Sequence, residues 1–191
     1  AYPDLEPRFV EEQTQHLITR LRNGNLDLAI MALPSEATGM VDSPLYTEKF
    51  SIVCPPDHPI AGREDVELAE LKDLDLLLLD DGHCLRDQVV DLCRHANINP
   101  AEATNSVTRA SSLTTIMQLV MGGLGCTLVP ESALATECHG KDVAIAHFAS
   151  DVTAEREVGL VFRSSAARAE EFREFGTLIT AAYNKAIERS R

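Results

Sequence analysis

The sequence predicts an α/β fold, in one large domain or two small ones. The chain has 191 residues, of which 45% are hydrophobic and 25% charged, which is an ordinary globular composition. Short apolar runs alternate along it with segments of about a dozen residues that have helical periodicity. Glycines and prolines separate most of these segments. Strands that alternate with helices favour mostly parallel pairing.

The first third of the chain contains one predicted helix and two predicted extended segments. The helix covers residues 9–23, because its leucine and isoleucine side chains fall on one face and a glycine follows it. The apolar run at 26–33 is typical of a short buried strand, which Pro34 ends. Residues 44–59 form an extended stretch, since the prolines at its end exclude a helix.

The middle of the chain continues the alternation. Apolar runs at 74–79 and 124–129 are typical of strands. Helices are expected over 84–96 and 111–121. A serine at the start of the second can cap it, and two glycines end it. A further short helix begins at Pro130.

A strand is predicted at 158–162, and an amphipathic helix at 168–191 closes the chain. The chain is expected to pass between two domains in extended segments near residues 46–50 and 153–158. These segments would be the boundaries of a central inserted domain. The two ends of the chain would then together form the other domain.

The chain is acidic, with a formal net charge of -13 at pH 7. Proteins bind nucleic acid largely through lysine and arginine side chains that neutralise phosphates, so an acidic surface opposes such binding. We therefore expect that this segment alone does not bind DNA. The sequence contains neither a run of ~18 apolar residues nor the pattern of a signal peptide. This indicates a cytoplasmic protein without a membrane partner.

Five cysteines are spread without regular spacing: Cys54, Cys84, Cys93, Cys126 and Cys138. An odd number is unlike a secreted disulfide scaffold, and in a reducing compartment all five are expected to be thiols. A pair that does form would then act as a switch. We expect Cys54, Cys126 and Cys138 to be packed or surface thiols. No second Cys/His pair stands at zinc-ligand spacing, so neither a metal nor a cofactor is expected.

The stretch from Asp81 to Cys93 carries the candidate chemistry. Cys84 is expected where a loop becomes a helix, and unpaired amides and the helix dipole favour a thiolate there. His83 and Arg86 add possible positive charge. A thiolate is the form of cysteine that attacks a peroxide, and the sulfenic acid that results can condense with a second thiol.

The spacing of Cys84 and Cys93 creates a geometric conflict. In one continuous helix their Cα atoms are ~13 Å apart along the axis and lie on opposite faces. A disulfide requires Cα atoms about 4.4–6.8 Å apart. Either the two thiols never pair, or their pairing destroys at least two turns of helix. Spacing alone does not decide, since two such cysteines are more commonly buried small hydrophobes.

The run Asp81-Gly82-His83-Cys84-Leu85-Arg86-Asp87-Gln88, followed by Cys93, resembles the redox motif of the OxyR-type peroxide sensors, a branch of the LysR-type transcription regulators. Other segments are similar to sequence motifs of LysR effector domains. These segments lie at residues 24–30, 44–46, 55–59, 111–130 and 158–163. The resemblance thus covers nearly the whole chain.

The resemblance implies a fold of two α/β lobes of the periplasmic-binding-protein type, with a cleft between them. Residues 1–47 and 155–191 would form the first lobe, and residues 48–154, with the redox cysteines, the second. It also implies that three parts of such a regulator are absent from this chain: the N-terminal winged helix-turn-helix, the linker helix and the first strand of the regulatory domain.

By the same resemblance, Cys84 would be the peroxidatic cysteine and Cys93 the resolving one. The partners implied are hydrogen peroxide, a second copy of the chain in a homodimer, and DNA bound through the absent N-terminal domain. The full-length form would be a tetramer.

The resemblance also implies a peroxide pocket around the reactive sulfur. His83 and Asp87 match positions that bind peroxide and polarise its bond. Thr14 matches a pocket hydroxyl. Arg156 matches a basic residue that faces the sulfur and stabilises the thiolate and the charge on the departing oxygen. Gln88 is a further candidate for the same pocket.

Two alternative functions remain open. A plain effector domain would hold a small organic acid between its lobes and would keep signalling after a Cys93→Ser substitution. A thiol peroxidase would share the thiolate chemistry but would consume peroxide far beyond one equivalent. The leading hypothesis is a regulatory domain that is not an enzyme.

Overall fold

The structure, a computed structural model, describes residues 6–99 and 104–190. Residues 1–5 and 191, which belong to the predicted first lobe and the predicted closing helix, lie outside the described residues. Helices and strands alternate over the described part, so the predicted α/β class is confirmed. No helix in these ranges is both long enough and apolar enough to cross a membrane.

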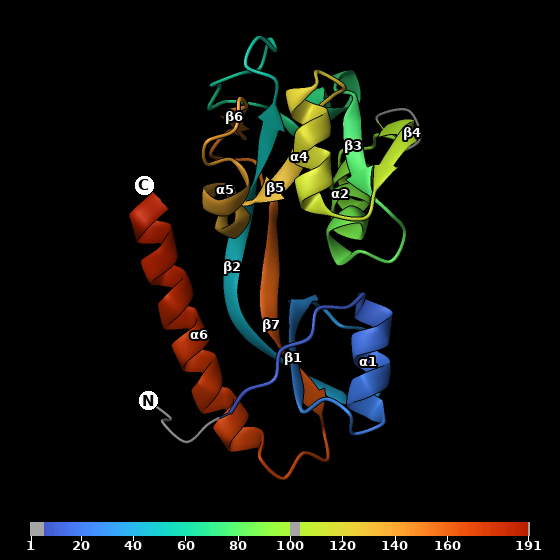
Figure 1. The fold of residues 1–191 in the computed structure, drawn as a ribbon, viewed down its shortest axis with the longest axis vertical. Helices are drawn as coiled ribbons and strands as arrows, with labels where there is room; N and C mark the ends of the chain where they lie inside the picture. The colour runs from blue at the N-terminus through green and yellow to red at the C-terminus, as the bar shows by residue number, and fades with distance from the viewer. Residues whose placement is uncertain (1–5, 100–103, 191) are drawn as a thin grey trace.

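The larger sheet is built around two long strands that lie side by side, β2 (Met40–Cys54) and β7 (Glu155–Arg163). In Figure 1 they run along the length of the molecule and connect its upper and lower groups of elements. β1 (Leu28–Leu33) pairs with β7 at one end, whereas β5 (Thr127–Pro130) and β6 (Ala144–His147) pair with β2 at the other. All of these pairings are antiparallel.

The prediction of mostly parallel pairing is therefore wrong for the described strands. Among the named strands, only β3 (Leu76–Leu79) and β4 (Thr104–Ala110) pair in parallel, in a separate two-stranded sheet. A parallel pair of consecutive strands needs a crossover connection, which is usually a helix. In the larger sheet the paired strands are not consecutive in the chain: β7 lies between β1 and β2 and is antiparallel to both.

The helices largely follow the predicted positions. Their bounds are α1 (Thr14–Arg22), α2 (Cys84–His95), α4 (Leu113–Met121), α5 (Glu131–Glu137) and α6 (Ala169–Ser190), with a 3-10 helix at Leu68–Asp73. The Ser112 side chain caps α4 by accepting a hydrogen bond from the Thr115 amide at 3.2 Å, and Gly122 ends this helix. The 3-10 helix, β4 and β6 are additions to the predicted elements.

Several predicted boundaries are wrong, among them those of the extended stretch at 44–59, where β2 covers Met40–Cys54, and two of them have a clear physical cause. α1 begins at Thr14 rather than at residue 9, because the preceding residues do not pack: the Phe9 side chain is 83% exposed. β5 begins at Thr127, three residues later than predicted. Gly125 has a φ of +147° and approaches the backbone so closely that a Cβ there would lie 2.2 Å from the Asp75 carbonyl oxygen. A turn that requires glycine therefore replaces the start of the predicted strand.

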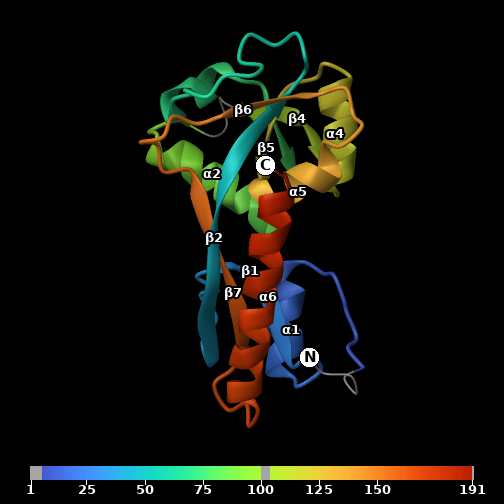
Figure 2. The same cartoon turned by 90° about the vertical axis from the view of Figure 1, so that its left-hand side faces the viewer.

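The hydrophobic core of the described residues is divided into four clusters. Two of them contain only residues from 50–154: one includes the buried side chains of α2, the other those of α4. The remaining two contain only residues from 17–45 and 160–179. Figure 2 shows α6 lying along β2 and β7 toward α5. There the Tyr183 ring stacks on Tyr46, with ring centroids 3.7 Å apart.

Candidate functional site

Cys84 is the first residue of α2, directly after the loop that follows β3. The chain turns at Gly82, whose φ is +93°, and His83 then adopts an extended N-cap conformation. No side chain caps the helix at His83. Cys84 is half-buried. The positive end of the helix dipole therefore lies beside a partly accessible thiol.

Cys93 lies on the same helix but is completely buried. α2 is continuous from Cys84 to His95, so the prediction of one helix through both cysteines is confirmed. Nine residues of helix correspond to about 13 Å along the axis and to positions on opposite faces. Both thiols are free in this structure, and they cannot bond while α2 is intact.

The other thiols are enclosed by the core. Cys54 and Cys126 are completely buried, and Cys138 is half-buried against the cluster beneath α4. Burial raises the pKa of the Cys54, Cys93 and Cys138 thiols above its ordinary value. Burial also raises the pKa of Cys126 to about 12, with further contributions from Cys54 and Asp75. The thiolate form is thus disfavoured at each of these positions.

Arg86 does not provide a free positive charge at the start of α2. Its guanidinium pairs with the carboxylates of Asp81 at 2.8 Å and Asp87 at 3.3 Å. The expectation that Arg86 supplies positive charge to Cys84 is therefore weakened, because two negative groups offset it. In Asp87 the contact with Arg86 is made by one carboxylate oxygen, Oδ1.

Arg156 reaches α2 from the neighbouring strand β7. Its Nη1 donates a hydrogen bond to Oε1 of Gln88 at 3.3 Å. Gln88 lies four residues after Cys84, so the two side chains project from the same face of α2, one turn apart. The Arg156 guanidinium therefore contacts the side chain of the residue one turn after Cys84.

Thr14 is the first residue of α1, whose N-terminus lies against the loop before Cys84. The neighbouring Gln13 donates a hydrogen bond from Nε2 to the Asp81 carbonyl at 3.4 Å. A Cβ added to Gly82 would lie 3.0 Å from the Gln13 side chain. The start of α1 therefore forms a wall beside the redox loop, and Gln13 is a contact that the sequence did not indicate.

Glu48 is a second residue that the sequence analysis missed. Its carboxylate is buried and pairs with Arg156 at 2.6 Å. A local signal does exist: Glu48 lies two residues before Phe50 and four before Ile52, on the face of β2 that is otherwise apolar. A charge at such a position marks either a strand boundary or a buried ion pair.

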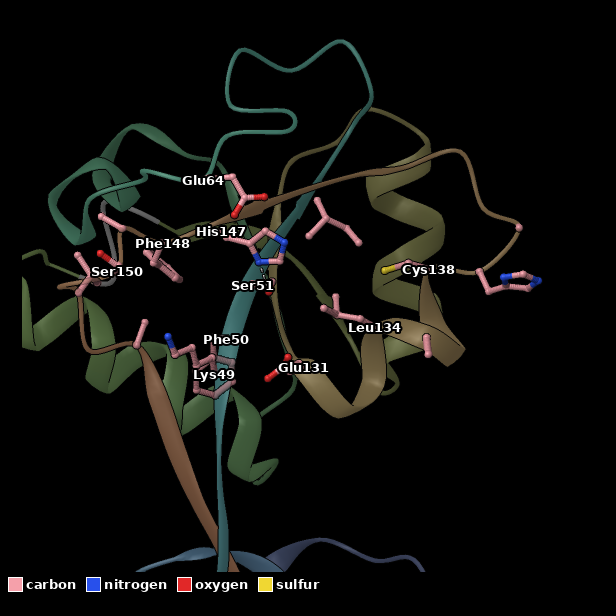
Figure 3. Close-up of a pocket in the computed structure, with 17 residues that line it drawn as sticks. Lys49, Phe50, Ser51, Glu64, Glu131, Leu134, Cys138, His147, Phe148 and Ser150 are labelled. Atoms are coloured by element: carbon pink, nitrogen blue, oxygen red, sulfur yellow. Dashed lines mark hydrogen bonds between the residues drawn. The ribbon is translucent and has the colours of Figure 1, made fainter. Parts of the chain in front are cut away.

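A pocket of about 1040 Å³ lies elsewhere, between β2, α5, β6 and the segment after β6. In Figure 3 its labelled residues include Ser51 and His147, whose Oγ and Nδ1 atoms are 3.0 Å apart. None of the predicted site residues lines this pocket. Among the residues that the structure describes, no group of three His, Cys, Asp or Glu side chains could hold a metal ion.

Comparison with known proteins identifies close relatives. The family described as LysR substrate binding domain matches residues 1–184. A probable hydrogen peroxide-inducible genes activator of Mycobacterium avium is 48% identical over 177 residues, 93% of this chain and 56% of that protein.

Solved structures agree with this match. A cysteine mutant of Corynebacterium glutamicum OxyR with H2O2 bound has a TM-score of 0.95 and 60% identity, over 98% of this chain and 58% of that chain. The oxidised form of the same OxyR has a TM-score of 0.85 and 61% identity, over 98% of this chain and 57% of that chain. The chain thus spans little more than half the length of the relatives it matches, 56% to 58%. This chain belongs to the family of LysR substrate-binding domains and, within that family, to the OxyR-type regulatory domains.

Proposed function

We propose that this chain is the hydrogen-peroxide-sensing regulatory domain of a LysR-type transcription regulator. In this proposal Cys84 reacts with peroxide and then forms a disulfide with Cys93. The observation that carries it is that one intact helix, α2, holds a partly accessible thiol and a buried thiol too far apart to bond. Further support comes from the Corynebacterium glutamicum OxyR, which has been solved with H2O2 bound and in an oxidised form.

The first step uses the Cys84 thiolate as the nucleophile. Its sulfur attacks one peroxide oxygen, the O–O bond breaks, and the second oxygen leaves as hydroxide, which takes up a proton to give water. Cys84 is thereby oxidised to a sulfenic acid. As α2 opens, the Cys93 thiol leaves the core, gives up its proton and attacks this sulfur; the displaced hydroxide takes up that proton to give a second water. Two thiols and one peroxide yield one disulfide and two waters.

Four further residues complete the proposed pocket. Arg156 stabilises the thiolate and the charge on the departing hydroxide, and its contact with α2 one turn from Cys84 supports this role. Thr14 contributes a hydroxyl from the start of α1. His83 and Asp87, on either side of Cys84 in the sequence, bind the peroxide and polarise its O–O bond.

Disulfide formation opens α2 and so changes the surface of the domain. We propose that this alters the contacts between copies of the protein, in a dimer and, at full length, a tetramer. The change would then reach DNA in the cytoplasm through a winged helix-turn-helix outside this chain. The net charge of -13 supports DNA binding by another domain, because this domain would repel the phosphates of DNA.

We further propose that residues 1–47 and 155–191 form one lobe and residues 48–154 the other. The composition of the core supports this boundary. None of the four clusters of the described residues combines side chains from both sets. The link between the sets would then be the two long strands, β2 and β7.

The test treats the reduced full-length protein with one equivalent of peroxide. Disulfides are mapped by mass spectrometry, and circular dichroism follows the helix content. We expect a Cys84–Cys93 bond with a loss of helix, and in a Cys93→Ser variant a sulfenic acid at Cys84 with the helix retained. Unchanged thiols in the full-length protein would contradict the proposal.

The same experiment separates a sensor from an enzyme. A regulatory domain that is not an enzyme consumes about one equivalent of peroxide per chain and then stays oxidised until it is reduced. A thiol peroxidase would turn over repeatedly once a reductant is supplied.

A further inference from the structure

Glu48 is a charged side chain in an otherwise apolar layer, and its side chain is 0% exposed. A buried carboxylate is costly unless it is paired and fully hydrogen-bonded. One oxygen, Oε1, accepts from Nε and Nη2 of Arg156 at 2.8 and 2.6 Å. The other, Oε2, accepts from the Ser132 amide in the first turn of α5 at 3.0 Å. The carboxylate is therefore held from two sides.

The same contacts orient Arg156. Glu48 and Arg156 lie directly opposite each other on β2 and β7. Because Nε and Nη2 are engaged by Glu48, the remaining Nη1 is directed at Gln88 of α2. The Phe50 ring also faces the guanidinium, with its centroid 5.9 Å away. These neighbours hold the guanidinium in one orientation, toward the first turns of α2.

We infer that Glu48 is a positioning residue, which holds the Arg156 guanidinium against the reactive end of α2 and thereby sets the rate at which Cys84 reacts with peroxide. This inference rests on the proposed function. Glu48 acts through Arg156 and not on the peroxide itself. Its second contact, with the Ser132 amide, keeps the carboxylate in place independently of α2. The paired strands β2 and β7, together with α5, thus fix Arg156 in place before peroxide binds.

The test compares Glu48→Gln and Glu48→Asp in the full-length protein with a matched control, Glu157→Gln. Glu157 is also on β7, next to Arg156 in the sequence, but it is exposed. All proteins carry Cys93→Ser, so that only the first oxidation step is followed. The readout is the second-order rate constant for sulfenic acid formation at Cys84 after rapid mixing with peroxide.

We expect Glu48→Gln to lower this rate constant by about tenfold, because Arg156 loses its counter-charge and can turn away from α2. Glu48→Asp should cause a smaller decrease, since it keeps the charge but is shorter by one methylene. Glu157→Gln should react like the parent protein. A purely structural role of Glu48 would instead reduce stability and leave the rate of the folded protein unchanged.

A second readout observes Arg156 directly. Its Nε–H resonance in a ¹H–¹⁵N spectrum, assigned with an Arg156→Lys variant, should shift in Glu48→Gln and stay in place in Glu157→Gln. If Glu48→Gln does not fold, Glu48→Asp, which keeps the charge, decides by the same two readouts. A parent-like rate or an unmoved Arg156 signal in a folded Glu48 variant would overturn the inference. No oxidation of Cys84 in the parent protein would overturn the proposed function instead.

Discussion

Helices α2 and α4 each follow a strand and each bury side chains in a core cluster of residues 50–154, yet their N-terminal ends are built differently. α4 begins with a serine cap, in which Ser112 accepts from the Thr115 amide, and ends at Gly122. α2 begins at His83 without a side-chain cap and is followed by Asn97, whose φ is +57°. A serine cap is worth about 1 kcal/mol. The C-terminal ends differ less, because asparagine tolerates the left-handed region and the Ile98 amide donates to the Cys93 carbonyl just as the Leu124 amide donates to that of Leu119.

The difference teaches how α2 can be a helix and still open. α4 is stabilised by its serine cap as well as by packing. α2 depends on packing, through Val89, Leu92 and Cys93, and on contacts such as that between Gln88 and Arg156. When a disulfide forms at the N-terminus of α2, no side-chain cap therefore has to be broken for the first turn to unwind. The predictions below test this contrast, from the largest expected effect to the smallest.

The largest effect concerns the two half-buried thiols. Cys84→Ser should abolish the reaction of the full-length protein with one equivalent of peroxide, because the nucleophile is removed. Cys138→Ser, which removes the half-buried thiol near α4, should leave it unchanged. Mass spectrometry of the treated proteins checks both. Equal loss of reaction in the two variants would show that the position on α2 is not what matters.

The second effect concerns the buried thiols beneath α2, which have no counterpart among the fully buried residues beneath α4. Burial raises the pKa of Cys126 from 9.0 to about 12, so above pH 9 the unfolded thiol ionises while the folded one stays protonated. Stability is therefore complete below the unfolded pKa and is lost as the pH rises. Between pH 8 and 10 the ionisation of Cys126 alone should lower the free energy of unfolding by about 1 kcal/mol.

Urea unfolding of the reduced protein at these two pH values measures this cost. A Cys126→Ala variant has a small cavity, so it is less stable at both values, but its stability should change less between them. A pH dependence identical to that of the parent protein would contradict the assignment. Cys93 contributes in the same direction, since burial also raises its pKa.

The third effect tests whether α2 must open. Asp91 is exposed on α2, and replacing it with Gly instead of Ala weakens the helix by about 1 kcal/mol. If only the reduced form contains the intact helix, as proposed, Asp91→Gly should have a reduction potential lower than Asp91→Ala by about 20 mV. Redox titration against glutathione measures this. The pair Gln118→Gly and Gln118→Ala, exposed on α4, should differ in stability but share one potential.

The smallest effect concerns the caps themselves. Ser112→Ala should lower the free energy of unfolding by about 0.5–1 kcal/mol, because the Thr115 amide loses its acceptor. His83→Ala should change it by much less, since no side-chain cap exists at that position. Urea unfolding at pH 7 compares them. Equal losses in the two variants would remove the contrast between the helix ends.

The sequence located α2 and α4 well because local signals determine them. Helical periodicity, a serine before one helix and glycines after it are all properties of neighbouring residues. The same signals failed for β5, where Gly125 must approach Asp75 across the fold. They also failed for the direction of strand pairing, since that direction depends on which strands become neighbours in the sheet and not on the sequence pattern within each strand.

The candidate site divides in the same way. Cys84 and Cys93 lie on one helix, as the sequence predicted, and His83 directly precedes it. Arg156 and Thr14 entered only by resemblance to a family. Glu48 and Gln13 were missed, because each acquires its partner through contacts between elements that are distant in the chain.

The sequence by itself thus determined the conflict within α2, since the number of residues between two cysteines on a helix sets both their distance and their faces. Only the tertiary structure decided which thiol is accessible and which is buried, and which charges surround α2. The physical reason is the separation along the chain of the residues that interact. Helix geometry is local, whereas Glu48 and Arg156 meet across 108 residues because the register of two long strands places them opposite each other.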